Sequence, residues 1–425
     1  MKDNLIPFYI FMFIKSILNR IKKALILIYQ QSLGSIISNF KISALRKLTC
    51  KEELIKVGFI VQMPELWDKQ ESVFKLMLAN KNFDPWLIIV PAYDFENSKI
   101  SDYCEEKAFF SNVAEGKYIL AKENNAWRDL SLDRFEYIFY QRPYDHYLPS
   151  ELQSDNISKK FKICYIPYAT PEIKNTGLYP FKFFKNVYLG FMEDGVAAEY
   201  NNKRFHIKRH FRFLNIGYPP FQKCMSVNCN SDNKTVLWTP RWSYDPVIGG
   251  SHFFEYFEQL SDYSWNTAQL IVRPHPMMWS NFLKEKRIDE KGINEICDKW
   301  KYNGIIIDRN CKIEDTFLYT DILISDRSSV IPMFFLTGRP IIYCEFKSDY
   351  GSLFTSILPG LYIANNWDEV NDFLTMLLSG EDPKKKLRKD IINTYFSQHK
   401  NASYSIVKCI YNDARGCNYE ANRNN

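Results

Sequence analysis

The sequence lacks the short motifs that identify several large classes of enzyme. It has no GxxxxGK[ST] phosphate-binding loop, no HExxH zinc motif, no GxSxG nucleophile motif, and no GxGxxG between a strand pattern and a helix pattern. Each of these motifs sets backbone and side chains for one chemistry, such as cradling nucleotide phosphates or presenting a serine. The sequence therefore gives no support for a P-loop nucleotidase, a zincin, an α/β-hydrolase or a dinucleotide-dependent oxidoreductase.

Cysteine pairs are also missing. The ten Cys of this 425-residue chain are scattered without a CxxC pair, and Cys164 and Cys344 fall in apolar runs that predict buried strands. Isolated thiols of this kind are typical of small buried residues in a reducing compartment. The pattern argues against a disulfide framework or a zinc site, and we expect neither a metal nor a cofactor.

Excess charge is confined to one end of the chain. Residues 1–50 hold eight Lys or Arg and one Asp, a balance of +7, against a net charge of +6 for the whole chain. The remaining residues are therefore close to neutral. This balance gives no case for nucleic-acid binding, and we expect no nucleic-acid partner.

The apolar run at residues 5–14 is too short to span a bilayer, which takes about 20 residues. No small-residue cleavage site follows it, so a secretory signal is not expected. We predict that residues 1–54 form a basic amphipathic helical arm that lies on an anionic membrane surface. The alternative is a helix docked on the protein's own surface. The predicted apolar face holds Ile14, Ile17, Leu18, Ile21, Leu25 and Ile28, and the polar face holds Lys15, Asn19, Lys22 and Lys23.

From residue 55 onward, apolar strand patterns alternate with helical patterns, which is typical of an α/β fold with parallel sheets. The length predicts about two domains of roughly 150–200 residues each. We predict a Rossmann-like domain over residues 55–225 and a second over 233–380. A helical tail follows over 381–425, in which Asp382 caps the helix and Pro383 opens it. The strand patterns cover residues 57–61, 86–91, 135–140, 161–167, 186–189, 235–238, 269–272 and 304–308.

The second domain is organised around residues 315–343. The pattern predicts a short helix at 316–319, a buried strand at 321–324, an apolar helix at 330–336 ended by Gly338, and a strand at 341–343. A strand, helix and strand of these lengths form a βαβ unit and imply a parallel sheet. Between the first strand and its helix lies a polar segment, here called the elbow, made of Ser325, Asp326, Arg327, Ser328 and Ser329.

The elbow has two interpretations. A strand's carboxyl end and a helix N-terminus are where open α/β sheets bind ligands, and free N–H groups there favour a phosphate. The hydroxyls of Ser328 and Ser329 and the cation of Arg327 would add donors. Alternatively, Ser325, Asp326 and Ser328 merely cap the helix, which is the commoner use of such residues.

Two more polar clusters follow strand patterns in the second domain. Arg241 follows the strand at 235–238, and Arg273 and His275 follow the strand at 269–272. Strand ends on one edge of a parallel sheet converge, so these residues and the elbow are predicted to share one anion site. Residues 249–252 (GGSH) have no strand directly before them and are interpreted as a loop. The basic run 203–212 is read as solvated charge, with docking of a phosphate-bearing acceptor as the alternative.

The motifs LWTPRWS (237–243), IVRPHP (271–276), and TDILISDRSS with GRPIIY (320–329 and 338–343) together resemble the CDP-glycerol glycerophosphotransferase family. Looser agreement lies in FIVQMPELW (59–67), IFYQRPYD (138–145) and CYIPYATPEI (164–173), so the resemblance covers about residues 55–375. It implies a GT-B fold, with two Rossmann-like domains facing across a cleft. It also implies synthesis of teichoic-acid-like or capsular polymers in bacteria.

The resemblance further implies roles for the residues of the predicted site. It places His275 near the reacting diphosphate of a CDP-activated donor, Ser328 and Ser329 on that diphosphate, and Asp326 as the residue that shapes the elbow. Arg241 and Arg273 would add positive charge. Expected partners are the nucleotide-activated donor, a membrane-anchored polymer acceptor and the anionic cytoplasmic face of the bacterial plasma membrane.

The sequence departs from the family pattern at two places. Arg327 stands where family members commonly have Tyr. Residues 165–173 contain no His, although many members carry an HGTPLK-like segment there whose His is the presumed base; Glu172, Asp145 and His146 are the alternatives for that role. Two other functions stay open from the sequence: a GT-B glycosyltransferase that uses a nucleotide-sugar, and a non-catalytic scaffold for polymer assembly.

Overall fold

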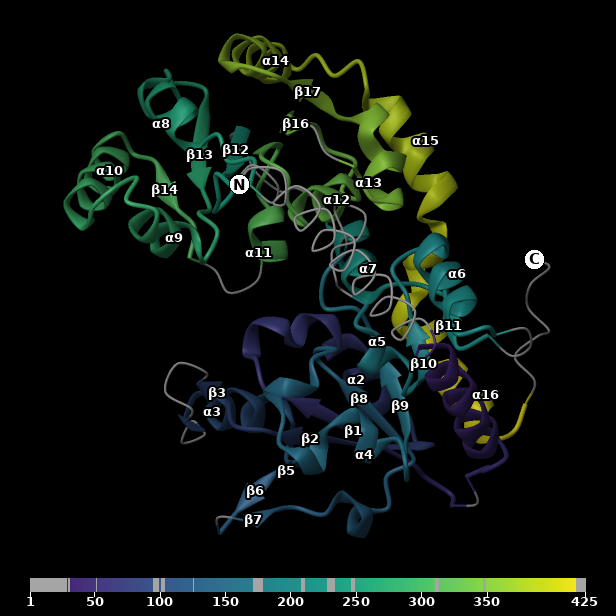
Figure 1. Ribbon diagram of the computed structural model, residues 1–425. Helices are drawn as coiled ribbons and strands as arrows, with labels where there is room; N and C mark the ends of the chain where they lie inside the picture. The colour runs from purple at the N-terminus through teal and green to yellow at the C-terminus, as the bar shows by residue number, and fades with distance from the viewer. Residues whose placement is uncertain are drawn as a thin grey trace, which may run out of the picture.

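The computed structural model describes residues 29, 31–50, 52–94, 99–100, 104–124, 126–170, 179–207, 211–227, 234–245, 249–309, 313–346 and 349–417. Within them, two parallel sheets are each flanked by helices, and the sheets lie in two separate parts of the molecule (Figure 1). The expected α/β class with parallel sheets is therefore confirmed. Most of the predicted arm, residues 1–28 and residue 30, lies outside the described residues.

The first sheet has seven parallel strands in the order β11-β10-β9-β8-β1-β2-β5. Its inner strand β1 pairs with β2 over seven residues and with β8 on the other side. Nearly every side chain of β1, β8, β9 and β10 is buried, because helices cover both faces of a parallel sheet. The strands are β1 (Ile55–Val61), β2 (Phe83–Ile89), β5 (Tyr118–Leu120), β8 (Tyr137–Tyr140), β9 (Lys162–Tyr165), β10 (Val187–Phe191) and β11 (Phe213–Leu214).

The second sheet has six parallel strands in the order β14-β13-β12-β15-β16-β17. The predicted βαβ unit is present: β15 and β16 are parallel neighbours, and Gly338 between them has φ +76°, the left-handed value for which glycine is suited. The strands are β12 (Lys234–Thr239), β13 (Ala268–Val272), β14 (Ile306–Ile307), β15 (Ile322–Ser325), β16 (Ile341–Cys344) and β17 (Tyr362–Ala364).

Helices connect the strands of each sheet. In the first part these are α2 (Glu71–Leu78), α3 (Cys104–Val113), α4 (Ser154–Ile157), α5 (Phe181–Phe184), α6 (Gly195–Arg204) and α7 (Pro219–Met225). In the second part they are α8 (Phe253–Asp262), α9 (Met278–Lys284), α10 (Glu290–Tyr302), α11 (Ile313–Phe317), α12 (Val330–Phe335), α13 (Ser352–Ile357) and α14 (Trp367–Ser379). Two short hairpins, β3 (Tyr93–Asp94) with β4 (Lys99–Ile100) and β6 (Lys122–Glu123) with β7 (Ala126–Trp127), complete the first part.

The C-terminal helices run from the second part back to the first (Figure 1). α15 (Lys385–Tyr395) and α16 (Ala402–Ala414) are separated by the 3-10 turn Ser397–Asn401, and α16 packs against α2. The expectation that Asp382 caps this tail was wrong. α15 begins at Lys385, and the Asp382 carboxylate accepts hydrogen bonds from the Tyr362 hydroxyl and the Arg388 guanidinium instead.

Residues 31–46 form a helix that docks on the first part of the molecule. Its inner face buries Ser38, Ile42 and Leu45. Asn39 Nδ2 donates to the carbonyl of Phe205 at 2.7 Å, and the buried Arg212 donates to Ser38 Oγ at 3.2 Å. Along residues 31–46, one face of the helix therefore packs against the protein's own surface. No helix in the described ranges is both long and apolar enough to cross a membrane.

Candidate active site

The three predicted polar clusters of the second sheet follow neighbouring strands. β12 lies between β13 and β15, and all three are parallel. Arg241 therefore follows the carboxyl end of β12, His275 that of β13, and the elbow that of β15. The structure thus places these clusters on one edge of the sheet, the edge at which α/β folds bind their ligands.

The elbow is fixed mainly by hydrogen bonds to its neighbours. Ser325 is fully buried, and its Oγ is 2.7 Å from Thr239 Oγ1 on the adjacent strand. Ser328 Oγ accepts from the N–H of Val330 at 3.2 Å, so the capping interpretation holds for this serine. Ser329 lies at the N-cap position without a side-chain cap bond and is partly exposed. Ser325 is therefore part of the framework, whereas Ser328 and Ser329 lie nearer the surface.

Two of the predicted cations are engaged by the protein itself. Arg273 Nη1 is 2.6 Å from the carboxylate of Asp308, which also accepts from the hydroxyl of Thr316 at 2.6 Å. Arg327 is 1% exposed, donates to the carbonyl of Gly249 at 3.2 Å, and lies over the ring of Phe346 at 4.8 Å. The donor-binding roles expected of both arginines stay predictions; in this structure an ion pair holds Arg273 and burial encloses Arg327.

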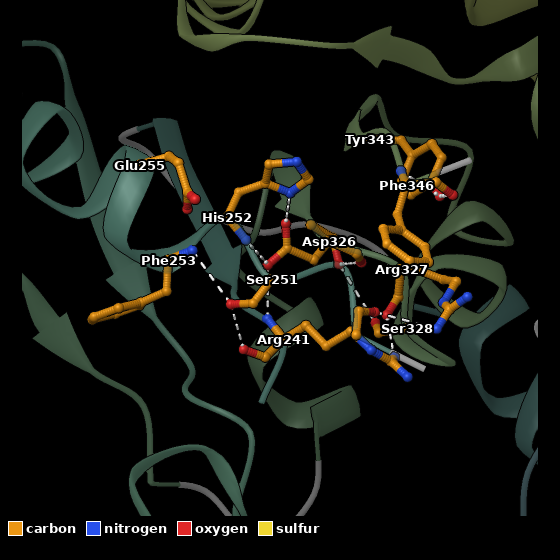
Figure 2. Close-up of polar contacts among 12 residues, drawn as sticks. Arg241, Ser251, His252, Phe253, Glu255, Asp326, Arg327, Ser328, Tyr343 and Phe346 are labelled. Atoms are coloured by element: carbon orange, nitrogen blue, oxygen red, sulfur yellow. Dashed lines mark hydrogen bonds and ion pairs between the residues drawn. The ribbon is translucent and has the colours of Figure 1, made fainter. Parts of the chain in front are cut away.

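Asp326 joins the elbow to two other segments (Figure 2). Its carboxylate is fully buried and accepts from the N–H of Arg241 at 2.8 Å and from the N–H of His252 at 3.2 Å. The Nδ1 atom of His252 is 2.7 Å from Asp326 Oδ1. The expected shaping role of Asp326 thus has a physical basis, since one carboxylate ties together the segments after β12 and β15 and the start of α8.

His252 is a candidate that the sequence reasoning missed. Its ring stacks on Tyr256 at 5.3 Å, and its side chain keeps 20% exposure. Burial lowers the pKa of His252, but the hydrogen bond and charge of Asp326, together with Glu255, outweigh this and raise the pKa above 6.5. The imidazole is therefore easier to protonate than a free one, with Nδ1–H directed at Asp326. The sequence signal was a single His in the segment GGSH (249–252), and its acidic partner lies 74 positions away.

Arg241 links the elbow to His275. Its Nη1 donates to the carbonyl of Arg327 at 2.6 Å, and its guanidinium lies 5.7 Å from the Trp242 ring. The His275 ring lies 5.9 Å from the same Trp242 ring. Partial burial and then the charge of Arg241 lower the pKa of His275 to about 4. His275 is therefore neutral near pH 7.

The tautomer of His275 follows from one hydrogen bond. Its Nδ1 accepts from the N–H of Met277 at 3.1 Å, so in the neutral ring the proton is on Nε2. Trans prolines flank this residue, and their fixed backbone angles restrict the segment. His275 and His252 are thus two imidazoles with opposite pKa shifts on one sheet edge, an arrangement common at sites that bind and move charge.

The structure describes two of the three alternatives for the first-domain base. Glu172 lies outside the described residues. Asp145 is buried and accepts from the N–H and hydroxyl of Ser154 at 2.7 and 2.8 Å, so it fixes the start of α4. His146 is exposed and packs on Tyr147 with ring centroids 4.3 Å apart.

The two parallel sheets and their helices define the GT-B class of transferase fold. The structure matches that of the wall teichoic acid polymerase TagF with a TM-score of 0.56 at 15% identity, covering 94% of this chain and 98% of that chain. It matches the UDP-GlcNAc 2-epimerase of Neisseria meningitidis at 0.56 and 11%, covering 84% and 100%, and the putative UDP-N-acetylglucosamine 2-epimerase of Listeria monocytogenes at 0.55 and 11%, covering 86% and 99%. These likenesses confirm the expected fold.

Residues 221–412 match the family model described as CDP-glycerol:poly(glycerophosphate) glycerophosphotransferase. This region, a little under half of the chain, holds the second sheet and the site. The resemblance inferred from the motifs is confirmed, as is the expectation of a transferase of the CDP-glycerol glycerophosphotransferase type. No curated protein sequence matches the chain.

Proposed function

We propose that this chain moves glycerol phosphate, or a closely related group, from a CDP-activated donor to a growing cell-surface polymer such as teichoic acid or capsule. The observation that carries the proposal is the grouping of His275, Arg241, His252 and the elbow on one edge of the second sheet, inside the region matched by the family model. Such a cluster of cations and hydrogen-bond donors suits a diphosphate.

Each donor has a part in holding that diphosphate. The neutral His275 offers Nε2–H, and Arg241 offers guanidinium N–H groups beside it. His252, held by Asp326, offers Nε2–H as an imidazolium. Ser329 and the N–H groups of the elbow complete the donors, although α12 is only six residues long and its dipole adds little.

The reaction is an in-line displacement at the β-phosphorus of the donor. An acceptor hydroxyl oxygen forms the new bond to phosphorus while the bond to the bridging oxygen breaks, and CMP leaves with the electron pair. Negative charge grows on the leaving phosphate, and pre-positioned donors stabilise it without reorganising. Removing one such donor typically lowers kcat about 10²–10³-fold.

The proposal includes a peripheral position on the cytoplasmic face of the bacterial plasma membrane. The helix of residues 31–46 buries one face on the protein but exposes apolar side chains on the other, among them Leu33, Ile36, Ile37 and Phe40 at 44–76%. The exposed Lys182 of the adjoining α5 adds positive charge on this side, whereas Lys185 next to it pairs with Asp155. An apolar helix face next to basic residues suits an anionic bilayer, which would also carry the polymer acceptor.

The donor is tested by incubating the protein with CDP-glycerol and an acceptor and measuring CMP release. UDP- and GDP-sugars serve as rival donors. We expect CMP release by the wild type and a fall of about 100-fold or more in His275→Ala. His206→Asn is the control, since His206 is exposed with φ +53°, a backbone angle that Asn tolerates.

Other outcomes of the same assay contradict the proposal in different ways. Turnover of a nucleotide-sugar in place of CDP-glycerol would make the protein a glycosyltransferase. Polymer synthesis in cells that is unchanged by His275→Ala would favour a scaffold. Membrane association is tested by flotation with vesicles containing anionic lipid, where Phe40→Glu with Ile36→Glu should release the protein and Leu132→Glu, an 81% exposed position elsewhere, should not.

A further inference from the structure

The carboxyl edge of the first sheet holds a buried carboxyl group that the donor site does not use. Glu193 follows β10 and has no exposed surface. Tyr179 donates its hydroxyl to Glu193 Oε1, and Oε2 is buried with no hydrogen-bond partner in the described part of the chain. A buried polar atom left without a partner costs about 1–3 kcal/mol, so its presence calls for a physical reason.

A second oxygen of the same kind follows the next strand. β10 and β11 are parallel neighbours, so Glu193 and Asn215 come after the same edge of the sheet. Asn215 Oδ1 is also buried without a partner among the described residues. Its amide lies against the first residue of α6, because a Cβ added to Gly195 would be 3.4 Å from Asn215 Nδ2. Two buried polar oxygens without partners suit a ligand that brings hydroxyl groups.

This edge meets the edge of the second sheet that carries the elbow. Ser352, the first residue of α13, donates its hydroxyl to Asp194 Oδ2 at 2.7 Å, and Asp194 is the neighbour of Glu193. Ser352 closes the loop that follows β16, the strand paired with β15. The same loop holds Phe346, on which Arg327 of the elbow stacks. Phe346 and Ser352, on either side of residues 347–348, therefore contact the elbow and the neighbour of Glu193 respectively.

We propose that Glu193 is the general base for the acceptor and that Asn215 beside it binds a further hydroxyl of the acceptor. This inference rests on the proposed function. Glu193 Oε2 takes the proton of the attacking hydroxyl, whose oxygen bonds to the β-phosphorus of the donor while CMP leaves. The acceptor class is a polyol end with neighbouring hydroxyls, because one oxygen reacts and a second has a partner in Asn215.

The protonation behaviour of Glu193 supports this assignment. Burial, and then the charge of Asp194, raise the pKa of Glu193 to about 8, against an opposing effect of the Tyr179 hydrogen bond. The phenols of Tyr165 and Tyr218 also face this carboxyl. A general base works best when its pKa is near the working pH, because a sufficient fraction is then deprotonated and that carboxylate is still basic enough to accept the proton. The transfer rate should therefore rise with pH through about 8 and then level off.

Burial of Glu193 sets one requirement. The acceptor must reach the carboxyl from the side where the two sheets' edges meet, so the contact between Ser352 and Asp194 must open during turnover. Transferases of two domains commonly part and close between substrate binding and reaction. Water excluded from the closed site strengthens the interaction of the carboxylate with the hydroxyl.

The test is Glu193→Gln, which keeps the shape and removes the base. We expect kcat to fall about 100-fold or more with an unchanged Kd for CDP-glycerol, the rise of rate through pH 8 to vanish, and Glu193→Asp to regain part of the rate. The matched control is Glu136→Gln, since Glu136 is a partly buried carboxyl with a raised pKa, from burial first, that precedes β8 at the opposite edge of the sheet. It should behave as wild type.

A kcat of Glu193→Gln within about twofold of wild type, with the same pH profile, would overturn the inference. Should Glu193→Gln fail to fold, Asn215→Ala decides: a KM for the acceptor raised about tenfold at unchanged donor Kd supports the inference, and an unchanged KM overturns it. If the wild type releases no CMP from CDP-glycerol, that result contradicts the proposed function and not the role of Glu193. The same variants are then compared with the nucleotide donor that the wild type does use.

Discussion

The imidazole of His252 lies 2.7 Å from the fully buried carboxylate of Asp326, although the two residues are 74 positions apart in the chain. The pair joins the start of α8 to the elbow after β15. Because the carboxylate also accepts two backbone N–H groups, it positions the ring and the loop together. The nucleotide-donor site therefore depends on Asp326, a buried acid that positions the neighbouring segments.

The first prediction concerns the pH dependence of this pair. The folded pKa of His252 is raised above 6.5, so its pairing stabilises the fold fully below about pH 6.5 and less as pH rises through the folded pKa. Melting temperatures of wild type and His252→Gln should differ most at acid pH and converge in alkali. His206→Asn, at an exposed histidine away from Asp326, is the control variant. A difference that grows with pH would contradict the ion pair.

His275 should titrate in the opposite direction. Burial and Arg241 hold its pKa at about 4, so the ring stays neutral at pH 6 with the proton on Nε2. Nitrogen NMR of histidine-labelled protein, assigned with His275→Gln, measures both the tautomer and the pKa. As pH falls from 6.5 towards 4, the unfolded chain protonates His275 before the folded chain does, so the free energy of unfolding falls. His275→Gln should remove this loss of stability. A His275 signal that is cationic at pH 6 would refute this account of the site.

Gly250, in the loop before α8, and Gly304, after α10, give a matched pair of glycine substitutions. A Cβ on Gly250, at φ +95°, would lie 2.6 Å from Phe346 Cγ, the ring on which Arg327 stacks. A Cβ on Gly304, at φ +71°, meets nothing within 4 Å. Both changes to Ala carry a left-handed strain of about 1–2 kcal/mol, but only Gly250→Ala displaces the elbow. We expect Gly250→Ala alone to weaken CDP-glycerol binding, measured by calorimetry, and equal effects would count against the loop's role.

An ion pair between Asp413 of α16 and the buried Lys162 of β9 holds α16 against the first sheet. Asp413 accepts from Lys162 at 2.9 Å and from the hydroxyls of Tyr137 and Tyr188 at 2.6 and 2.7 Å. The Lys162 side chain is 7% exposed, so Asp413→Ala leaves a buried charge without its partner. We expect a loss of about 3–5 kcal/mol in the free energy of unfolding, measured in urea. Asp390→Ala, at an exposed carboxyl on α15, should change it by less than about 0.5 kcal/mol.

The architecture was largely predictable from the sequence, because continuous apolar runs such as residues 57–61 and 321–324 are characteristic of strands buried on both faces. The order of polar segments after those strands was predictable for the same reason. The partners of the polar side chains were not. Arg273 pairs with Asp308, and His252 pairs with Asp326. Both pairs depend on how distant segments align in the fold, and the hydrophobic periodicity of the sequence gives no information on that alignment.

Other differences have the same origin. Asp382 precedes an apparent helix start and fits a capping pattern, yet tertiary contacts with Tyr362 and Arg388 take its carboxylate. Glu193 gave no sequence signal because burial, not spacing, distinguishes it from other acids. The domain boundaries at 54, 225, 233 and 380, and the arm over residues 1–28, stay predictions.

The central claim is that the donor's diphosphate is held on the edge formed by β12, β13 and β15. The most direct measurement is the Kd for CDP-glycerol, by calorimetry, of wild type and of Arg241→Gln, with the exposed Arg287→Gln as control. A lost charged hydrogen bond is worth about 1.5–3 kcal/mol, so the account predicts binding weakened about 10–100-fold in Arg241→Gln and unchanged in the control. Equal affinity in all three proteins, each folded as judged by its melting temperature, would contradict the account.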